Sequence, residues 1–233
     1  PYIEKNIIGR RKVIYDLVDL ACKNRCVQAI GVCGTGKSII AKKAAQYIYE
    51  RRVFKEGVVY IDLRMKTDIV FMYRYIASAL NLPSVNNESE LCKALESLEI
   101  LIILDNVDPL IKKENQTFIN NLNNIVANTS SPKLLVCSQK ELKLENSQKY
   151  EILPLSEQEA AAMLTSLIEP TWKGKVDVKY PERFIDTGFL KQISLIPSAI
   201  QQVAPIFKQK TLDQVLLEYR GNHSFQPLDR SLE

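Results

Sequence analysis

Over the first 153 residues the chain alternates between two patterns of apolar and polar positions. Short, almost wholly apolar runs are typical of strands buried on both faces, and the longer segments between them carry apolar residues at helical spacing. The strands are expected at residues 27–32, 57–62, 100–105, 133–138 and 150–153. The helices are expected at residues 9–24, 37–52, 69–81, 87–97 and 115–127. Such alternation predicts a parallel sheet flanked by helices, an α/β fold.

After Pro154 the strand pattern stops and only helical spacing remains. The sequence SEQE at residues 156–159 has the form of a capping box. Pro197 can open a later helix, because a helix needs no backbone N–H at its first position. The helices are expected at residues 156–168, 181–194, 197–209 and 212–219. The predicted organisation is a sheet domain, a small all-helical subdomain and a tail, over residues 1–153, 155–221 and 222–233.

The stretch GVCGTGKS at residues 31–38 follows the first predicted strand and opens the second predicted helix. This is the G-x-x-x-x-G-K-S pattern in the order that a phosphate-binding P-loop requires. Glycines let backbone N–H groups turn inward, and the helix start adds N–H groups and a positive dipole end. Lys37 would bridge the β- and γ-phosphates, and Ser38 would bind Mg²⁺. The alternative is a glycine-rich turn without a ligand. The residues expected to bind nucleotide here are Gly31, Gly34, Thr35, Gly36, Lys37, Ser38 and Ile39.

A carboxylate, Asp105, ends the third predicted strand. Because Mg²⁺ prefers hard oxygen ligands, Asp105 is the expected metal ligand beside Ser38, although an aspartate in a strand-end turn is the alternative. Hydrolysis also needs a group that orients the attacking water, and Asn106 cannot accept a proton as a carboxylate does. Asp108 is either a substitute for that acid or a cap of the following loop. The candidate catalytic residues are Lys37, Asp105 and Asp108.

The strand KLLVCS at residues 133–138 is expected beside the Asp105 strand, if the sheet has a strand inserted between its two motif strands. The run GVVYIDLR, which lies between the two motifs in sequence, supports that arrangement. Ser138 and Gln139 would then face the γ-phosphate. Gln139 is able to hydrogen-bond there, but it brings no positive charge.

The composition is that of a globular chain with a sizeable core, since 46% of its 233 residues are hydrophobic and 25% are charged. The net charge of +4 is mild and forces neither a nucleic-acid nor a membrane partner. No apolar stretch reaches the length of about 18 residues that a membrane span needs. The five cysteines are odd in number and several lie in apolar segments, which favours a reducing, cytoplasmic compartment over a disulfide framework.

In their order along the chain, these motifs resemble the NB-ARC type of STAND ATPase, the switch module of plant resistance proteins and apoptotic-protease activators. Besides the P-loop, LIILDNVD at residues 101–108 is similar to the family's acidic strand segment, and KLLVCSQ falls where the family has a sensor strand. LPLSEQEAAAML at residues 153–164 resembles the opening of the family's first helical subdomain. Ile8, Gly9 and Arg10 resemble its adenine-side motif, and Leu195–Ala199 resembles its G-L-P-L-A segment.

The resemblance implies a signalling switch that binds ADP or ATP with Mg²⁺. Ile8, Gly9, Arg10 and Pro197 would lie on the adenine side. ADP would close the helical subdomain onto the sheet, and ATP would favour an open form that self-associates. The chain would be part of a longer protein with effector and sensor domains, and the tail would lead to a winged-helix subdomain that is absent here.

Three positions depart from the family pattern. Asn106 replaces a second acid, Gln139 replaces a sensor arginine, and Ser194 or Leu195 stands where the family has a glycine. The first two departures predict weak or absent hydrolysis with nucleotide binding intact.

The main rival is an actively hydrolysing P-loop ATPase, either AAA-like or associated with nucleic acid. A small-molecule kinase and a scaffold that has lost nucleotide are further alternatives. Because the charge is mild and no basic recognition helix is evident, a nucleic-acid partner is not expected.

Overall fold

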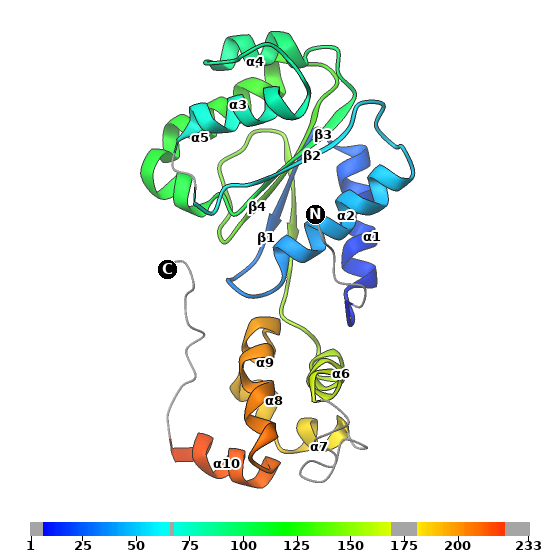
Figure 1. Cartoon of the computed structure of the whole chain (residues 1–233), viewed down its shortest axis with the longest axis vertical. Helices are drawn as coiled ribbons and strands as arrows, with labels where there is room; N and C mark the ends of the chain where they lie inside the picture. The colour runs from blue at the N-terminus through cyan, green and yellow to red at the C-terminus, as the bar shows by residue number, and fades with distance from the viewer. Residues whose placement is uncertain (1–6, 66–67, 169–180, 222–233) are drawn as a thin grey trace. The chain divides into compact units, whose positions relative to one another are not determined.

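The computed structural model describes residues 7–65, 68–168 and 181–221. Within this part of the chain, five parallel strands form one sheet in the spatial order β2-β3-β4-β1-β5 (Figure 1). Their bounds are β1 Cys26–Ile30, β2 Gly57–Asp62, β3 Ile100–Asp105, β4 Lys133–Ser138 and β5 Ser147–Glu151. This is the predicted α/β fold, a parallel sheet of the P-loop type followed by helices.

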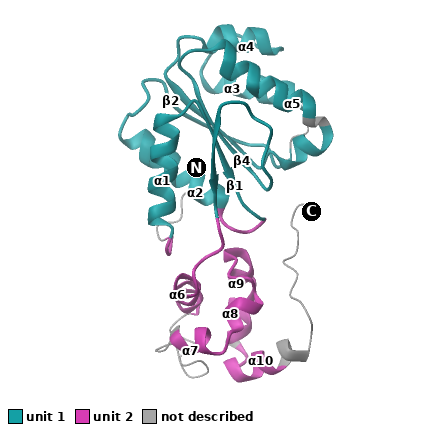
Figure 2. Ribbon diagram, turned by 180° about the vertical axis from the view of Figure 1, so that it is seen from behind, with its two compact units in different colours: residues 1–3, 10–32, 37–152 teal, residues 4–9, 33–36, 153–233 magenta. Residues whose placement is uncertain are grey.

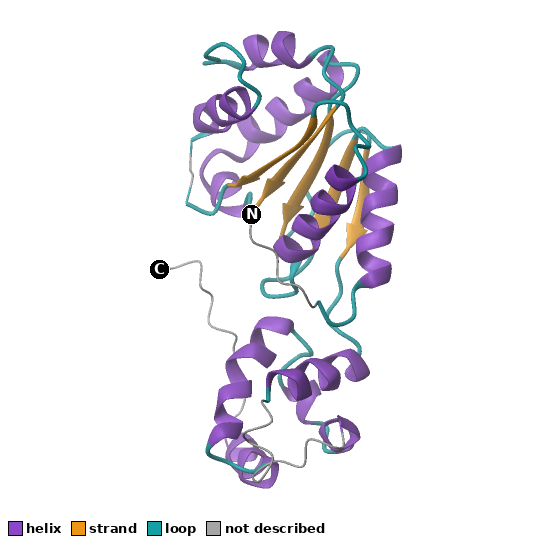
Figure 3. Ribbon diagram, turned by 45° about the vertical axis from the view of Figure 1, so that its right-hand side comes forward, coloured by secondary structure: helices purple, strands orange, loops and turns teal. Residues whose placement is uncertain are grey.

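Helices cover both faces of the sheet (Figure 3). Helices α1 and α2 pack on one face, against β-strand side chains such as Ile103 and Leu135. Helices α3, α4 and α5 pack on the other, against Ile102 and Val136 among others. The bounds are α1 Arg11–Lys23, α2 Lys37–Glu50, α3 Ile69–Ala79, α4 Glu88–Leu95 and α5 Asp108–Asn128. The wholly apolar runs of β3 and β4 are explained by these two helical layers.

Strand β4 lies where the sequence placed it, because it pairs with β1 on one side and with β3 on the other. It therefore separates the strand that leads into the P-loop from the strand that ends in Asp105. Since all five strands are parallel, their carboxyl ends meet at one edge of the sheet, which is where ligands bind in such folds. The P-loop, Asp105 and Ser138 share this edge.

Two predicted elements have different bounds in the structure. Helix α5 begins at Asp108 rather than at residue 115, because Pro109 fits the first turn of a helix and the polar run at residues 112–116 hides the apolar spacing. Strand β5 begins at Ser147 rather than at residue 150, and its mostly exposed polar side chains are typical of an edge strand.

The far end of α5 is held by Arg25, which lies just before β1. The Arg25 guanidinium donates to the backbone carbonyls of Val126 at 3.3 Å and Thr129 at 2.7 Å, and also to the carbonyl of Ser130. The last carbonyls of a helix have no partner within the helix, so a cation at this position stabilises its end. Burial lowers the pKa of Arg25 from its usual value.

The chain divides into two compact units (Figure 2). The larger contains the sheet, in residues 10–32 and 37–152, and the smaller contains the described parts of residues 4–9, 33–36 and 153–233. The bounds in the smaller unit are α6 Glu157–Leu167, α7 Pro181–Asp186, α8 Phe189–Gln192, α9 Pro197–Val203, the 3₁₀ helix Ala204–Lys208 and α10 Leu212–Gly221. Its buried core includes Phe207, which makes edge-to-face contacts with Phe184 and Phe189.

Local signals set the helix bounds in the smaller unit. Ser156 and Glu159 form the predicted capping box at the start of α6. The helix predicted over residues 181–194 is instead two short helices, because Gly188 adopts a left-handed φ of 67° between them. Pro205 ends α9 and leads into the 3₁₀ helix, as a proline inside a helix is expected to do. The predicted tail at residues 222–233 lies outside the described residues.

No helix in the described ranges is both long and apolar enough to cross a membrane. All five cysteines lie in these ranges and are free thiols. Burial raises the pKa of Cys26, at the start of β1, to about 12.

Two successive residues before α9 adopt left-handed backbone conformations, Ser194 with φ 59° and Leu195 with φ 56°. A residue with a Cβ atom pays roughly 1–2 kcal/mol for this conformation, and glycine does not. These are the positions at which the resembled family carries glycine, so the structure gives a physical reason for a glycine there.

Replacing the exposed Ser194 by glycine is expected to raise the free energy of unfolding by about 0.5–1 kcal/mol, the strain relieved less the added freedom of the unfolded chain. Chemical denaturation measures this change. Ser194→Ala is the matched control, since alanine keeps the Cβ atom and should give no gain. Equal effects of the two substitutions would contradict the explanation.

Candidate nucleotide site

The P-loop connects the end of β1 to the start of α2. Gly34 and Gly36 have φ angles of 82° and 94°, which only glycine adopts without strain. The backbone N–H of Gly31 donates to the carbonyl of Ser138 at 3.2 Å, so the start of the loop is fixed to the end of β4. Helix α2 begins at Lys37, and its first N–H groups have no partners within the helix.

Lys37 lies folded against its own loop. Its Nζ donates to the carbonyl of Gly31 at 2.6 Å and to that of Val32 at 3.1 Å. The ammonium is thus held against the backbone of the loop, and its predicted role toward a phosphate stays a prediction. Ser38 and Ile39 follow in the first turn of α2, both half-buried.

Residues 33–36 belong to the smaller unit, together with α9. Within that unit the backbone N–H of Ser198 donates to the carbonyl of Gly34 at 3.2 Å. A Cβ atom on Gly34 would collide with the Ser198 side chain, so the position needs a glycine for space as well as for its φ angle. Pro197, the first residue of α9, directly precedes Ser198.

The predicted adenine-side residues lie before α1. Gly9 and Arg10 have left-handed φ angles of 68° and 64°, and Arg10 is buried at the start of that helix. Ile8 is half-buried. Gly9 belongs to the smaller unit, where a Cβ atom on it would collide with the carboxylate of Glu159. The sequence singled out these residues by resemblance, and their roles toward a nucleotide stay predictions.

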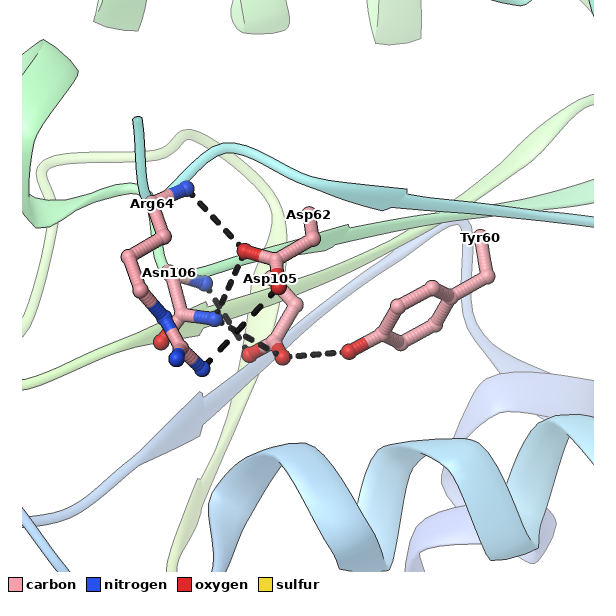
Figure 4. Close-up of polar contacts among 5 residues, drawn as sticks. All are labelled: Tyr60, Asp62, Arg64, Asp105 and Asn106. Atoms are coloured by element: carbon pink, nitrogen blue, oxygen red, sulfur yellow. Dashed lines mark hydrogen bonds and ion pairs between the residues drawn. The ribbon is translucent and has the colours of Figure 1, made fainter. Parts of the chain in front are cut away.

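Asp105 is wholly buried and is the acceptor in a cluster of hydrogen bonds (Figure 4). Its Oδ1 accepts the backbone N–H of Asn106 at 3.0 Å. Its Oδ2 accepts the Tyr60 hydroxyl at 2.5 Å and the side-chain amide of Asn106 at 3.2 Å. The Cys137 thiol on β4 also hydrogen-bonds to this carboxylate. Four donors satisfy the capacity of a carboxylate, which is what allows the charge to be buried.

The two donors with titratable protons keep them. Burial, the Asp105 charge and the hydrogen bond to Asp105 raise the pKa of Tyr60. Burial and the Asp105 charge likewise raise the pKa of Cys137, and the positive charge of Lys37 only partly offsets them. Both groups therefore stay protonated at neutral pH and donate to Asp105.

Asp108 does not lie free beside Asp105. Its Oδ1 accepts the backbone N–H of Gln139 at 2.9 Å, across the gap between α5 and the end of β4. This is a structural use of the carboxylate, in the first turn of α5 rather than in the loop that the sequence indicated. The Gln139 side chain is exposed at the same edge.

Asn106 follows Asp105 with a left-handed φ of 56°, which asparagine tolerates better than most residues. Its amide donates both to Asp105 and to Oδ1 of Asp62, the second bond at 2.9 Å (Figure 4). The backbone N–H of Arg64 also donates to Asp62, and its guanidinium lies 3.9 Å from the carboxylate. Tyr60, Asp62 and Arg64 are residues that sequence reasoning did not assign to the site. Their signal was the run GVVYIDLR, which ends at the same edge of a parallel sheet.

The donor types fit the predicted magnesium ion. Ser38 supplies a hydroxyl and Asp105 a carboxylate, both hard oxygens. Because the four donors already fill Asp105, an ion would have to replace one of them or bind through a water molecule. No group of three or more His, Cys, Asp or Glu side chains able to hold a metal occurs in the ranges that the structure covers.

No protein-family model and no curated protein sequence matches the chain. Solved structures do. ORC1 of Aeropyrum pernix in complex with DNA aligns with a TM-score of 0.64 and 16% identity, over 94% of this chain and 66% of that one. Drosophila ORC bound to DNA aligns with a TM-score of 0.61 and 14% identity, over 91% and 65%. A STAND protein of Pyrococcus horikoshii with a tetratricopeptide repeat sensor aligns with a TM-score of 0.59 and 13% identity, over 94% of this chain and 33% of that one.

These likenesses establish the P-loop ATPase fold over most of the chain. At such low identities they do not distinguish the NB-ARC type from the ORC type. The chain spans slightly less than two thirds of the two ORC chains and a third of the STAND chain. The expectation that no nucleic acid is involved gains no support from them, since both ORC structures contain DNA.

Tyr60→Phe is expected to lower the free energy of unfolding by about 1.5–3 kcal/mol, because it removes one donor to a buried charge. Tyr150→Phe is the matched control, since the Tyr150 hydroxyl donates to the half-buried Asp16 at 3.1 Å. Its cost should stay below about 1 kcal/mol. Denaturation of both variants in parallel measures the difference, and equal losses would show that Asp105 does not depend on Tyr60.

Proposed function

We propose that the chain binds ADP or ATP with Mg²⁺ and acts as the nucleotide switch of a larger signalling protein. The observation that carries this proposal is the edge at which the P-loop, Lys37 and Asp105 meet around β4. A flexible glycine backbone, a helix start and a lysine are what phosphates require, and a carboxylate at the neighbouring strand end suits the metal.

The switch behaviour rests on the two compact units and on the resemblance. Pro197 would close the adenine side in the ADP form, and the N–H of Ser198 is bonded to Gly34 of the P-loop. A nucleotide is able to shift such a protein between forms only as far as its affinities for the two forms differ. We infer that the ATP form opens and self-associates in the longer protein, where effector and sensor domains report the change.

Slow hydrolysis fits this role. Asn106 stands where a second acid would be, Asp108 is bonded to Gln139, and Gln139 itself carries no charge. Slow ATP hydrolysis keeps the protein in its ATP form for long enough to signal, as a switch requires.

A second candidate is a nucleic-acid-associated ATPase, favoured by the DNA in the two ORC structures. Titration of the protein with duplex DNA at rising salt tests it, because binding through phosphates weakens steeply with salt. Saturable, salt-sensitive binding that depends on ATP would favour this candidate over the switch.

Lys37→Ala is expected to weaken binding of ATP by about 10- to 100-fold, since a charge-assisted hydrogen bond contributes about 1.5–3 kcal/mol. Titration of a fluorescent ATP analogue measures the dissociation constant. Lys43→Ala is the matched control on the same helix, because Lys43 contacts Gln46 and not the loop. An unchanged affinity for ATP in Lys37→Ala would rule out the P-loop assignment.

A further inference from the structure

Three carboxylates, Asp62, Asp105 and Asp108, lie at or just after the carboxyl ends of β2 and β3, and they differ in what surrounds them. Asp105 is wholly buried among its donors, and Asp108 is bonded to the N–H of Gln139. Asp62, at the end of β2, is the most exposed of the three, with 42% of its side chain accessible. It is therefore the carboxylate that a water molecule reaches most readily.

Asp62 faces the same side of the sheet as the P-loop helix. Strand β2 pairs with β3 in register, so that Asp62 lies opposite Asp105. Side chains alternate along a strand, so Asp62 shares its face with Tyr60. Tyr60 packs in the cluster formed with α1 and α2, and Lys42 of α2 lies 5.2 Å above its ring. Asp62 and Asp105 thus point to the face that α2 covers, and α2 begins with the phosphate-binding residues.

Asn106 holds the two carboxylates together. Its amide nitrogen donates to Oδ1 of Asp62 at 2.9 Å and to Oδ2 of Asp105 at 3.2 Å, which uses both of its hydrogens. Asn106 is therefore a hydrogen-bond donor that lies between the negative charges of Asp62 and Asp105. An aspartate at this position would bring a third negative charge between them.

Among the described residues, hydrogen bonds reach only one oxygen of the Asp62 carboxylate. Its Oδ1 accepts the Asn106 amide and the backbone N–H of Arg64, the latter at 3.0 Å. Its Oδ2 lies 3.9 Å from the Arg64 guanidinium, which is beyond hydrogen-bonding distance. Oδ2 is thus held in place by the bonds of its partner oxygen and is able to accept a proton.

We propose that Asp62 is the general base of a slow ATP hydrolysis at this site, and that Asn106 is the residue that positions it. The proposal rests on the proposed function. In the step, a water molecule gives a proton to Oδ2 of Asp62 while its oxygen forms a bond to the γ-phosphorus. The bond from that phosphorus to the bridging oxygen breaks, and its electron pair stays on ADP. Inorganic phosphate and ADP leave, and Asp62 returns the proton to solvent.

The experiment compares Asp62→Asn with the wild type. An asparagine carbonyl at this position still accepts the Asn106 amide, so the local structure is kept while the base is lost. Single-turnover release of phosphate from Mg-ATP should fall by about 100-fold or more, the usual contribution of a general base. The dissociation constant for ATP should stay within about twofold. Asp19→Asn is the matched control, since the Asp19 side chain is 40% exposed and pairs with Lys23 on the outside of α1.

A second readout does not depend on turnover. Asn106→Asp should lower the midpoint of thermal unfolding by several degrees, because three carboxylates then face one another. The double variant Asp62→Asn with Asn106→Asp again has one amide and two carboxylates in the set, with the amide now at position 62. Its midpoint should return most of the way to that of the wild type, which tests the coupling of the two positions directly.

The outcomes separate the two proposals. Failure of the wild type to bind ATP would overturn the proposed function and this inference with it. Tight ATP binding without any phosphate release, or release that survives in Asp62→Asn, would overturn the inference alone. Additive midpoints in the double variant would also overturn it, because Asn106 would then not position Asp62.

Discussion

The burial of the Asp105 carboxylate is the constraint on which the edge of the sheet depends. A charge that is removed from water is tolerated only where donors replace the water, and here they come from three adjacent strands or their ends. Tyr60 reaches across from β2, Asn106 follows on β3, and Cys137 comes from β4. Each of these strands must therefore end at a fixed register relative to its neighbours. Because Asp62 ends β2 and Gln139 follows β4, the need to satisfy the Asp105 carboxylate also constrains where these two residues lie.

The part of the fold that follows from local chemistry could be predicted from the sequence. The P-loop, the apolar runs of β3 and β4, and the capping box at Ser156 are each encoded within about ten residues. The order of strands needed one further step, the insertion of β4 between β1 and β3, and the pairing confirms it. The predicted start of α5 was wrong, because its first turns carry polar residues that conceal the helical spacing.

The polar network around Asp105 was not predictable in this way. Tyr60 and Asp62 come within reach of Asp105 only through the register of β2 against β3, which no pattern in the sequence states. The left-handed conformation of Asn106 was not predictable from the sequence either, since asparagine occurs in many conformations. The sequence interpretation of Asn106 as the replacement of an acid gave no role to its side-chain amide. The structure shows it as a donor between two carboxylates, those of Asp62 and Asp105.

Helix α5 has a mechanical consequence for the sheet. It is bonded at its first turn to the end of β4 through Asp108, and near its last turn to the start of β1 through Arg25. With 21 residues it spans about 30 Å, so it connects the two opposite edges of the sheet. The carboxyl edge of the sheet and its amino edge are thus tied to each other through one helix.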